Sequence, residues 1–171
     1  MTITFLDPQV EISPYCWLVQ VGPRKLGVHK QRGWCMQLVS DDLVFFDSEA
    51  KCMPLVPILD AGVEELFSFL EKAANSNSDY SDVIRKFPQN LLIKHVFHTS
   101  FSSYWPEKAF AWLSADTSLH PAFLHELEKI TTNKAMPQGM RQKAKKIVKS
   151  LVSEARDQVV PSAADRQKGD A

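Results

Sequence analysis

The sequence predicts an α+β fold, in which a small N-terminal antiparallel β-sheet is followed by a C-terminal antiparallel helical bundle. Two observations support this prediction. Before about residue 60, the apolar residues form short runs that are rich in β-branched and aromatic side chains and are separated by glycine, proline or polar residues. After residue 60, they recur with the spacing of a helix that buries one face.

Three runs in the first part are typical of strands: residues 18–21, 34–39 and 43–46. Residues 40–42 read Ser-Asp-Asp and favour a hairpin turn, because aspartate side chains can bond to their own backbone there. Four prolines should shorten these strands or keep them at sheet edges, namely Pro8, Pro14, Pro54 and Pro57. Together these features predict a small antiparallel sheet.

The helical part begins after Asp60, which can cap a helix with the apolar positions Val63, Leu66, Phe67 and Leu70. A polar run over residues 75–81 predicts a loop. A short helical piece near 80–87 and a helix over 90–100 follow, with Pro88 between them.

Three amphipathic helices are expected between residues 102 and 155. The first begins near Tyr104, the second carries Pro121 in its first turn and ends at Asn133, and the third opens at Pro137. The third has an apolar stripe, formed by Met140, Ala144, Ile147, Val148, Leu151 and Val152. Short connections favour antiparallel packing of these helices.

The expected domain organisation has three parts. Residues 1–74 form a β-rich region with a closing helix, residues 75–158 form a helical region packed on it in one compact domain, and residues 159–171 form a disordered tail. The polar run 75–81 is the expected junction between the two folded parts.

The formal charge is zero, which excludes a strongly basic nucleic-acid binder, but the charges are distributed unevenly. Residues 1–70 carry five basic and nine acidic side chains, whereas residues 131–171 carry nine basic and four acidic ones. No acid lies between Glu128 and Glu154. Such asymmetry suggests a charged partner.

The C-terminal bases include a row spaced like one side of a helix, Arg141, Lys145 and Lys149. Two interpretations remain open: a solvated face opposite the apolar stripe, or a surface that contacts phosphates. The basic stretch contains no aromatic residue for base stacking, so nucleic acid is the less favoured partner.

Four acids gather near the predicted hairpin: Asp41, Asp42, Asp47 and Glu49. They either solvate a turn or attract a basic partner, which would raise the rate of association. Trp34 is close to them in the sequence and is a candidate apolar anchor of such an interface. The alternative for Trp34, as a strand residue, is a place in the core.

Catalytic motifs are absent from the sequence: there is no glycine-rich phosphate loop, no Gly-x-Ser-x-Gly and no His-Glu-x-x-His. His95 and His98 could face one metal ion, but no third ligand is apparent nearby. Cys16, Cys35 and Cys52 read as buried free thiols, one of which would have to meet His29 in space to form a nucleophile. We therefore expect neither enzymatic activity nor a metal or other cofactor.

The expected location is the cytoplasm. The N-terminus lacks the basic and apolar segments of a secretory signal. The longest charge-free apolar stretch, residues 52–59, is far shorter than the roughly 20 residues of a membrane-spanning helix and contains two prolines.

The stretches 103–113, 124–130 and 136–147, with Trp-x6-Trp-Leu and Arg-x-Lys-Ala-Lys-Lys among them, resemble the C-terminal helices of certain small bacterial proteins. These are immunity proteins of contact-dependent growth inhibition and related polymorphic toxin systems. The resemblance implies a cytoplasmic, non-catalytic protein that binds and neutralises a cognate toxin C-terminal domain, such as a nuclease. The alternatives are a nucleic-acid-associated or regulatory module acting through the basic helix, and an enzyme with a site assembled from scattered residues.

Overall fold

A computed structural model describes the backbone of residues 1–159 and the side chains up to residue 157. It confirms the α+β class, with a five-stranded antiparallel sheet followed by six α-helices in the described part of the chain. The chain forms two compact units, Met1–Asp116 and a second that begins at Thr117. The expected junction, 75–81, lies inside the first unit, and the expected tail from residue 160 onward lies outside the described residues.

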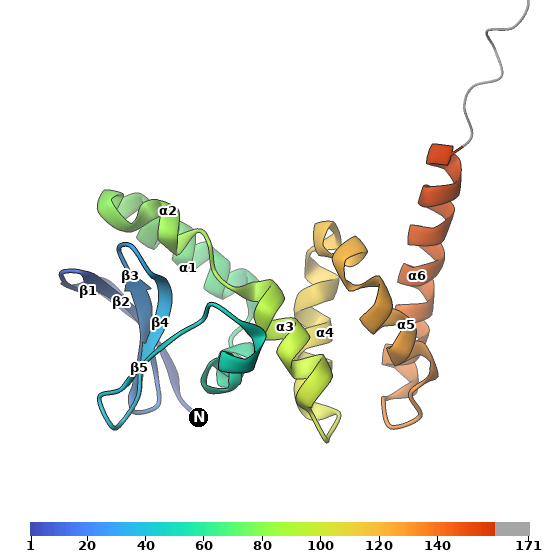
Figure 1. Ribbon diagram of the computed structural model, residues 1–171, viewed down its shortest axis with the longest axis horizontal. Helices are drawn as coiled ribbons and strands as arrows, with labels where there is room; N and C mark the ends of the chain where they lie inside the picture. Colours follow the sequence, from blue (N-terminus) through green and yellow to red (C-terminus); the bar gives the residue numbers. More distant parts are fainter. Residues whose placement is uncertain (160–171) are drawn as a thin grey trace, which may run out of the picture. The chain divides into compact units, whose positions relative to one another are not determined.

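The sheet is a meander in which each strand pairs with its neighbours in the sequence (Figure 1). Its strands are β1 (Ile3–Ile12), β2 (Tyr15–Val21), β3 (Arg24–His29), β4 (Gly33–Gln37) and β5 (Leu43–Phe45). The predicted turn between β4 and β5 is present, and Asp41 has a positive φ of 63° there. Aspartate tolerates this conformation better than most residues do.

Strands β1 and β3 are not among the three runs that the sequence pattern singled out. β3 carries two bases and a glycine, and most of β1 is exposed or half-buried, so neither presents an apolar run. β1 is an edge strand, and its pairing with β2 shifts between Phe5 and Val10. Pro8 lies within that shift, as expected for a residue that cannot donate a ladder hydrogen bond.

Gly27 allows two strands to approach closely. It lies opposite Trp17 in the pairing of β2 with β3, next to a shift in register. A Cβ atom at position 27 would overlap the carbonyl oxygen of Cys16 and would lie 2.8 Å from the Cα of Trp17. The site therefore requires glycine, and this lets the Trp17 ring pack with Cys35 and Phe45 in a small apolar cluster.

The helices of the first unit follow the sheet in the chain. The α-helices are α1 (Val63–Ser76), α2 (Ser81–Ile84), α3 (Gln89–Thr99) and α4 (Tyr104–Ala115). The 3₁₀ helices are η1 (Glu49–Lys51), η2 (Met53–Asp60) and η3 (Ser78–Tyr80). Asp60 is not the cap of α1, since Gly62 occupies that position and Asp60 instead accepts a hydrogen bond of 2.7 Å from the Tyr104 hydroxyl.

A chain of aromatic contacts joins the sheet to the helices within the first unit. The ring of Trp34 on β4 meets that of Phe87 edge-on at 4.9 Å between centroids, and Phe87 in turn contacts Trp112 of α4 at 6.2 Å. Phe67 of α1 contacts both of those rings, at 5.9 and 6.1 Å. Edge-to-face pairs of this kind add to the stability that burial of the rings provides.

The second unit contains η4 (Thr117–Phe123), α5 (Leu124–Thr132) and α6 (Gln138–Val159), and α5 and α6 pack as a helical hairpin. Asn133 ends α5, as predicted. The three expected amphipathic helices are all present, but α4 belongs to the first unit, where it packs against α3 and η2. The segment around Pro121 forms 3₁₀ turns, and the α-helix begins only at Leu124.

Candidate functional site

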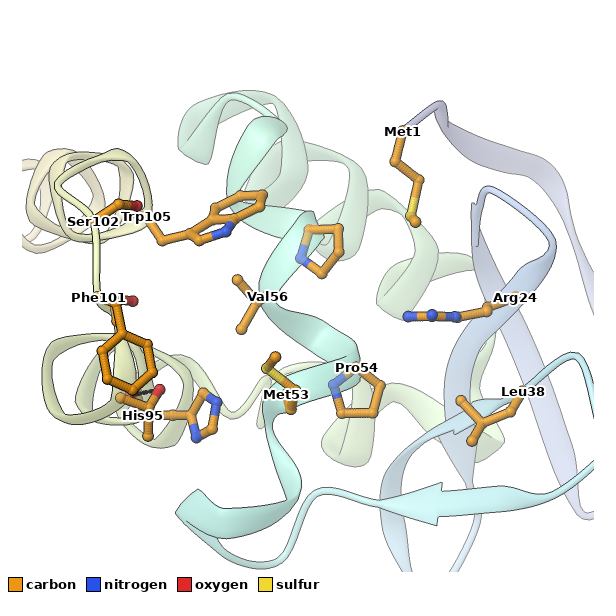
Figure 2. Close-up of a pocket in the computed structure, with 13 residues that line it drawn as sticks. Met1, Arg24, Leu38, Met53, Pro54, Val56, His95, Phe101, Ser102 and Trp105 are labelled. Carbon is orange, nitrogen blue, oxygen red and sulfur yellow. Dashed lines mark hydrogen bonds between the residues drawn. The ribbon is translucent and has the colours of Figure 1, made fainter.

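The first unit contains a groove of about 830 Å³ (Figure 2). Its walls come from the turns that flank the sheet, from η2, and from α3 and α4 with the loop that joins them. Most of its lining is apolar, including Leu38, Met53, Pro54, Val56, Phe101 and Trp105. The volume lies within the range of roughly 300–1,000 Å³ that is usual for small-molecule sites.

Two of the apolar wall residues are unusually exposed. Met53 at the start of η2 is 68% exposed, and Phe101 in the α3–α4 loop is fully exposed. The prolines at positions 54 and 57 lie within η2, where they favour this short, irregular helix over a longer α-helix. Large apolar side chains that are held at the surface in one place mark a binding surface more often than isolated ones do.

Two polar side chains project into the groove from opposite walls, as Figure 2 shows. Arg24 comes from the first position of β3, directly after the Gly22-Pro23 turn, where Gly22 has a φ of 56°. The Arg24 side chain is half-buried and has no ion pair with any residue that the structure describes. His95 comes from α3, is only 6% exposed, and has an Nε2 atom without a hydrogen-bond partner among the described residues.

No carboxylate lines the groove within the described part of the chain, so Arg24 is the only formally charged side chain in its walls. Hydroxyl groups are present near α3, on Thr99, Ser100 and Ser102. The Thr99 hydroxyl donates to the carbonyl oxygen of His95 at 2.7 Å. The groove therefore combines mostly apolar walls with one guanidinium that has no ion pair among the described residues and one buried ring nitrogen without a hydrogen-bond partner there.

The four predicted acids all lie on the segment 41–49, which we call the acidic segment. Asp41 and Asp42 are exposed at the β4–β5 turn, where Asp41 accepts from Gln37 Nε2 at 3.0 Å and Asp42 from the Ser40 hydroxyl at 2.7 Å. The backbone N–H of Leu38 donates to the carbonyl oxygen of Asp42 at 2.9 Å. Since Leu38 lines the groove, this turn borders one end of it.

The other two acids have charged or chargeable neighbours. Asp47 pairs with Lys51 at 2.9 Å, and this hydrogen bond lowers the pKa of the Asp47 carboxyl. Glu49 lies 2.7 Å from Nδ1 of His98. The part of the acidic segment without a basic partner in the described chain is therefore Asp41 and Asp42.

Trp34 does not lie with these acids on the surface. It is 4% exposed, its indole N–H donates to the carbonyl oxygen of Val83 at 3.0 Å, and its ring packs on Phe87. Of the two roles that the sequence left open for Trp34, the structure supports a place in the core. The buried side chain is not available on the surface as an anchor for a partner. A strand residue in the middle of a sheet faces one side or the other, and Trp34 faces the helices.

The basic row lies on α6 in the second unit. Lys145 and Lys149 are exposed, and neither has an ion pair with a described residue. Arg141 differs from them because it is half-buried and its Nε atom is enclosed without a partner in the described chain. Only the two lysines of the row are therefore fully available on the surface. Both interpretations of the row, a solvated face or a phosphate-binding surface, remain open.

The two candidate histidines do not form a metal site in the described residues, where no group of three His, Cys, Asp or Glu side chains could hold an ion. His95 faces the groove, whereas His98 faces Glu49. His29 uses its Nδ1 atom to accept from the backbone N–H groups of Gln31 and Arg32, both at 3.1 Å.

The three cysteines are buried, free thiols. Burial raises the pKa of Cys16 and Cys52 to about 11 and that of Cys35 to about 12. Burial disfavours the thiolate, which is the reactive form, so the thiols stay protonated at neutral pH. This environment does not activate any of them as a nucleophile.

We expect the thiols of the folded protein to react very slowly with iodoacetamide at pH 8, since a thiol with a pKa near 11 is roughly one part in a thousand thiolate there. In urea all three should react at the rate of free cysteine. Because these pKa values are raised on folding from 9.0, the folded state loses stability as the pH rises from about 9 to 11. Mass spectrometry of alkylated samples measures the reaction, and fast labelling of the folded protein would contradict this account.

The groove is a candidate site that could not be predicted from the sequence. Its lining residues come from five separate stretches of the chain, and Arg24 and Phe101 belong to no motif. The one available indication was the pair of prolines in 52–59, which rules out a regular helix there but does not reveal a cavity.

In the described residues, no helix combines the length and the apolar composition that are needed to cross a bilayer. Comparison with protein-family models, curated proteins and solved structures finds no match to this chain.

Proposed function

We propose that this chain is an immunity protein, which binds a cognate toxin domain in the cytoplasm and neutralises it by protein–protein interaction. The observation that carries the proposal is the surface around the acidic segment. Two exposed apolar side chains flank this segment, Val39 at 70% and Met53 at 68% exposure. Apolar contact area bordered by charge is the usual composition of a specific protein interface.

The charge of this surface suggests the kind of partner. A nuclease domain must present bases to the phosphates of its substrate, so its active-site surface attracts acids. Asp41 and Asp42 are the acids of the segment that lack a basic partner among the described residues. A toxin with a basic catalytic surface would complement them, and this complementarity would speed association. The C-terminal resemblance to immunity proteins supports the same proposal independently of the charge.

The direct test is co-expression with the product of the adjacent gene. The proposal predicts that the two proteins co-purify and that this chain relieves the growth arrest that its neighbour causes. A neighbour that is not toxic, together with the absence of any co-eluting partner, would rule the proposal out.

Reversing the two turn charges should slow association. For the double variant Asp41→Lys with Asp42→Lys, we expect the association rate constant at low salt to fall by about tenfold or more, because steering depends on long-range charge. Stopped-flow or surface plasmon resonance measures this rate. The matched control is Glu64→Lys with Glu65→Lys, which makes the same charge change at exposed positions of α1. Equal rates for both double variants would show that the acidic segment does not steer the partner.

A second candidate function is a nucleic-acid-associated or regulatory module, which the exposed lysines of α6 favour. Lys143, Lys145, Lys146 and Lys149 are exposed and unpaired within the described residues. This candidate predicts binding to duplex DNA or to heparin that weakens steeply with salt and with loss of Lys145 and Lys149. A lack of retention on heparin at low salt would exclude it.

A further inference from the structure

The groove of the first unit has features that the proposed interaction with a toxin does not use. Its walls are mostly apolar, it encloses about 830 Å³, and Arg24 carries the one formally charged side chain among its described lining residues. A half-buried guanidinium without a counter-ion beside an apolar wall can form a charge-assisted hydrogen bond with an anion, and such a bond is stronger there than in bulk water. The chemistry of this wall therefore favours an anionic ligand.

The number of cations limits which anion fits. A phosphate carries up to two negative charges and is normally bound by several bases or by a run of backbone N–H groups. Here Arg24 is the one lysine or arginine among the described lining residues. A carboxylate carries a single charge and matches the two parallel N–H groups of a guanidinium. One arginine in an apolar setting thus fits a monocarboxylate.

The opposite wall indicates a second polar contact. His95 is 94% buried, since only 6% of it is exposed, and its Nε2 atom is enclosed by the protein without a hydrogen-bond partner in the described part of the chain. Buried polar atoms in folded proteins almost always have a partner, so an orphan that lines a cavity points to a missing one. In Figure 2 the ring of His95 and the guanidinium of Arg24 face the groove from its two sides, with Met53, Pro54 and Val56 between them.

We propose that this groove binds a small amphipathic carboxylic acid. Its carboxylate pairs with Arg24, its apolar body lies on the wall formed by Met53, Pro54 and Val56, and a hydroxyl or carbonyl group further along it reaches His95. The ligand class is that of a medium-chain hydroxylated fatty acid. The site shares Met53 with the proposed toxin-binding surface, but the chain binds this ligand without the toxin.

The test uses the full-length chain and two probes that differ only at one end, ω-hydroxydecanoate and the uncharged decanediol. Isothermal titration calorimetry measures their affinities. We expect ω-hydroxydecanoate to bind saturably and at least about tenfold more tightly than decanediol, since a charge-assisted hydrogen bond pair contributes that much or more. Equal affinities would show an unselective apolar surface, and no binding of either probe at about 1 mM would show that the groove is not a small-molecule site. Both results would overturn the proposal.

The variants locate the contact. Arg24→Gln should lower the affinity for ω-hydroxydecanoate about tenfold and leave that for decanediol unchanged. The control is Lys25→Gln, the neighbouring exposed base on β3, which does not line the groove. In wild-type protein, the imidazole proton resonances of His95 should shift on titration with the acid, while those of the exposed His125 in the second unit should not. Binding that is insensitive to Arg24→Gln, or that shifts His125 instead of His95, would contradict the assignment.

Discussion

Replacement of Gly27 with alanine is expected to destabilise the first unit by about 3 kcal/mol or more, which is a large fraction of the stability of a typical domain. The added methyl group would overlap the carbonyl oxygen of Cys16 and would lie 2.8 Å from the Trp17 Cα and 2.9 Å from its ring. Two of these three atoms belong to the backbone of the paired strand, so no side-chain rotation relieves the overlap. Strands β2 and β3 would have to separate at the centre of the sheet.

Urea unfolding followed by circular dichroism measures this effect. Gly62→Ala is the matched control, because a Cβ atom there would meet only Glu65, at an ordinary 3.7 Å, and the Gly62 φ of −61° suits any residue. We expect the control to change the free energy of unfolding by less than about 1 kcal/mol. If Gly27→Ala were as stable as Gly62→Ala, the close approach of β2 and β3 described above would be wrong.

Truncation of Trp34 to alanine is expected to cost about 3–5 kcal/mol, the range for removing a large aromatic side chain from a core. The residue is 4% exposed and connects β4 with Phe87 and, through it, with Trp112. Trp34→Phe should cost less, about 1–3 kcal/mol, since a ring remains but the carbonyl oxygen of Val83 loses the indole donor at 3.0 Å.

Thermal and urea unfolding of the three proteins should therefore rank wild type above Trp34→Phe and Trp34→Phe above Trp34→Ala. The result also separates the two roles that the sequence left open for this residue. A surface anchor would weaken partner binding when it is truncated and leave stability almost unchanged. If the unfolding curve of Trp34→Ala overlaid the wild-type curve, Trp34 would not be a core residue, and the role of interface anchor would be supported instead.

The period of the apolar residues predicted the fold class and most helices, because burial of one helical face leaves a direct trace in the sequence. The expected helix over 90–100 corresponds to α3, Gln89–Thr99, and the stop at Asn133 is the end of α5. Strands β1 and β3 left no such trace. Their positions are set by pairing with β2, and pairing uses backbone groups that every residue except proline has.

The candidate site was predicted only in part, for a similar physical reason. Charge is visible in a sequence, so the acids of the segment 41–49 could be named, and the structure places the turn that carries Asp41 and Asp42 next to Leu38, which lines the groove. A cavity is a property of how distant segments meet. Nothing local distinguishes Arg24 from the adjacent Lys25, yet only Arg24 lines the groove. For Trp34, β-branched and aromatic neighbours indicated a strand but could not say which face of the sheet is covered.

The order of the strands has a consequence for how the protein forms. Each of the four strand pairs joins neighbours in the chain, so no pairing has to wait for a distant segment to be synthesised or to diffuse into place. Closing short loops costs little chain entropy, and domains rich in such local pairings fold faster than those that depend on remote ones. The sheet can therefore assemble hairpin by hairpin from the N-terminus as the polypeptide leaves the ribosome. The helices of the first unit would then condense on a surface that already exists.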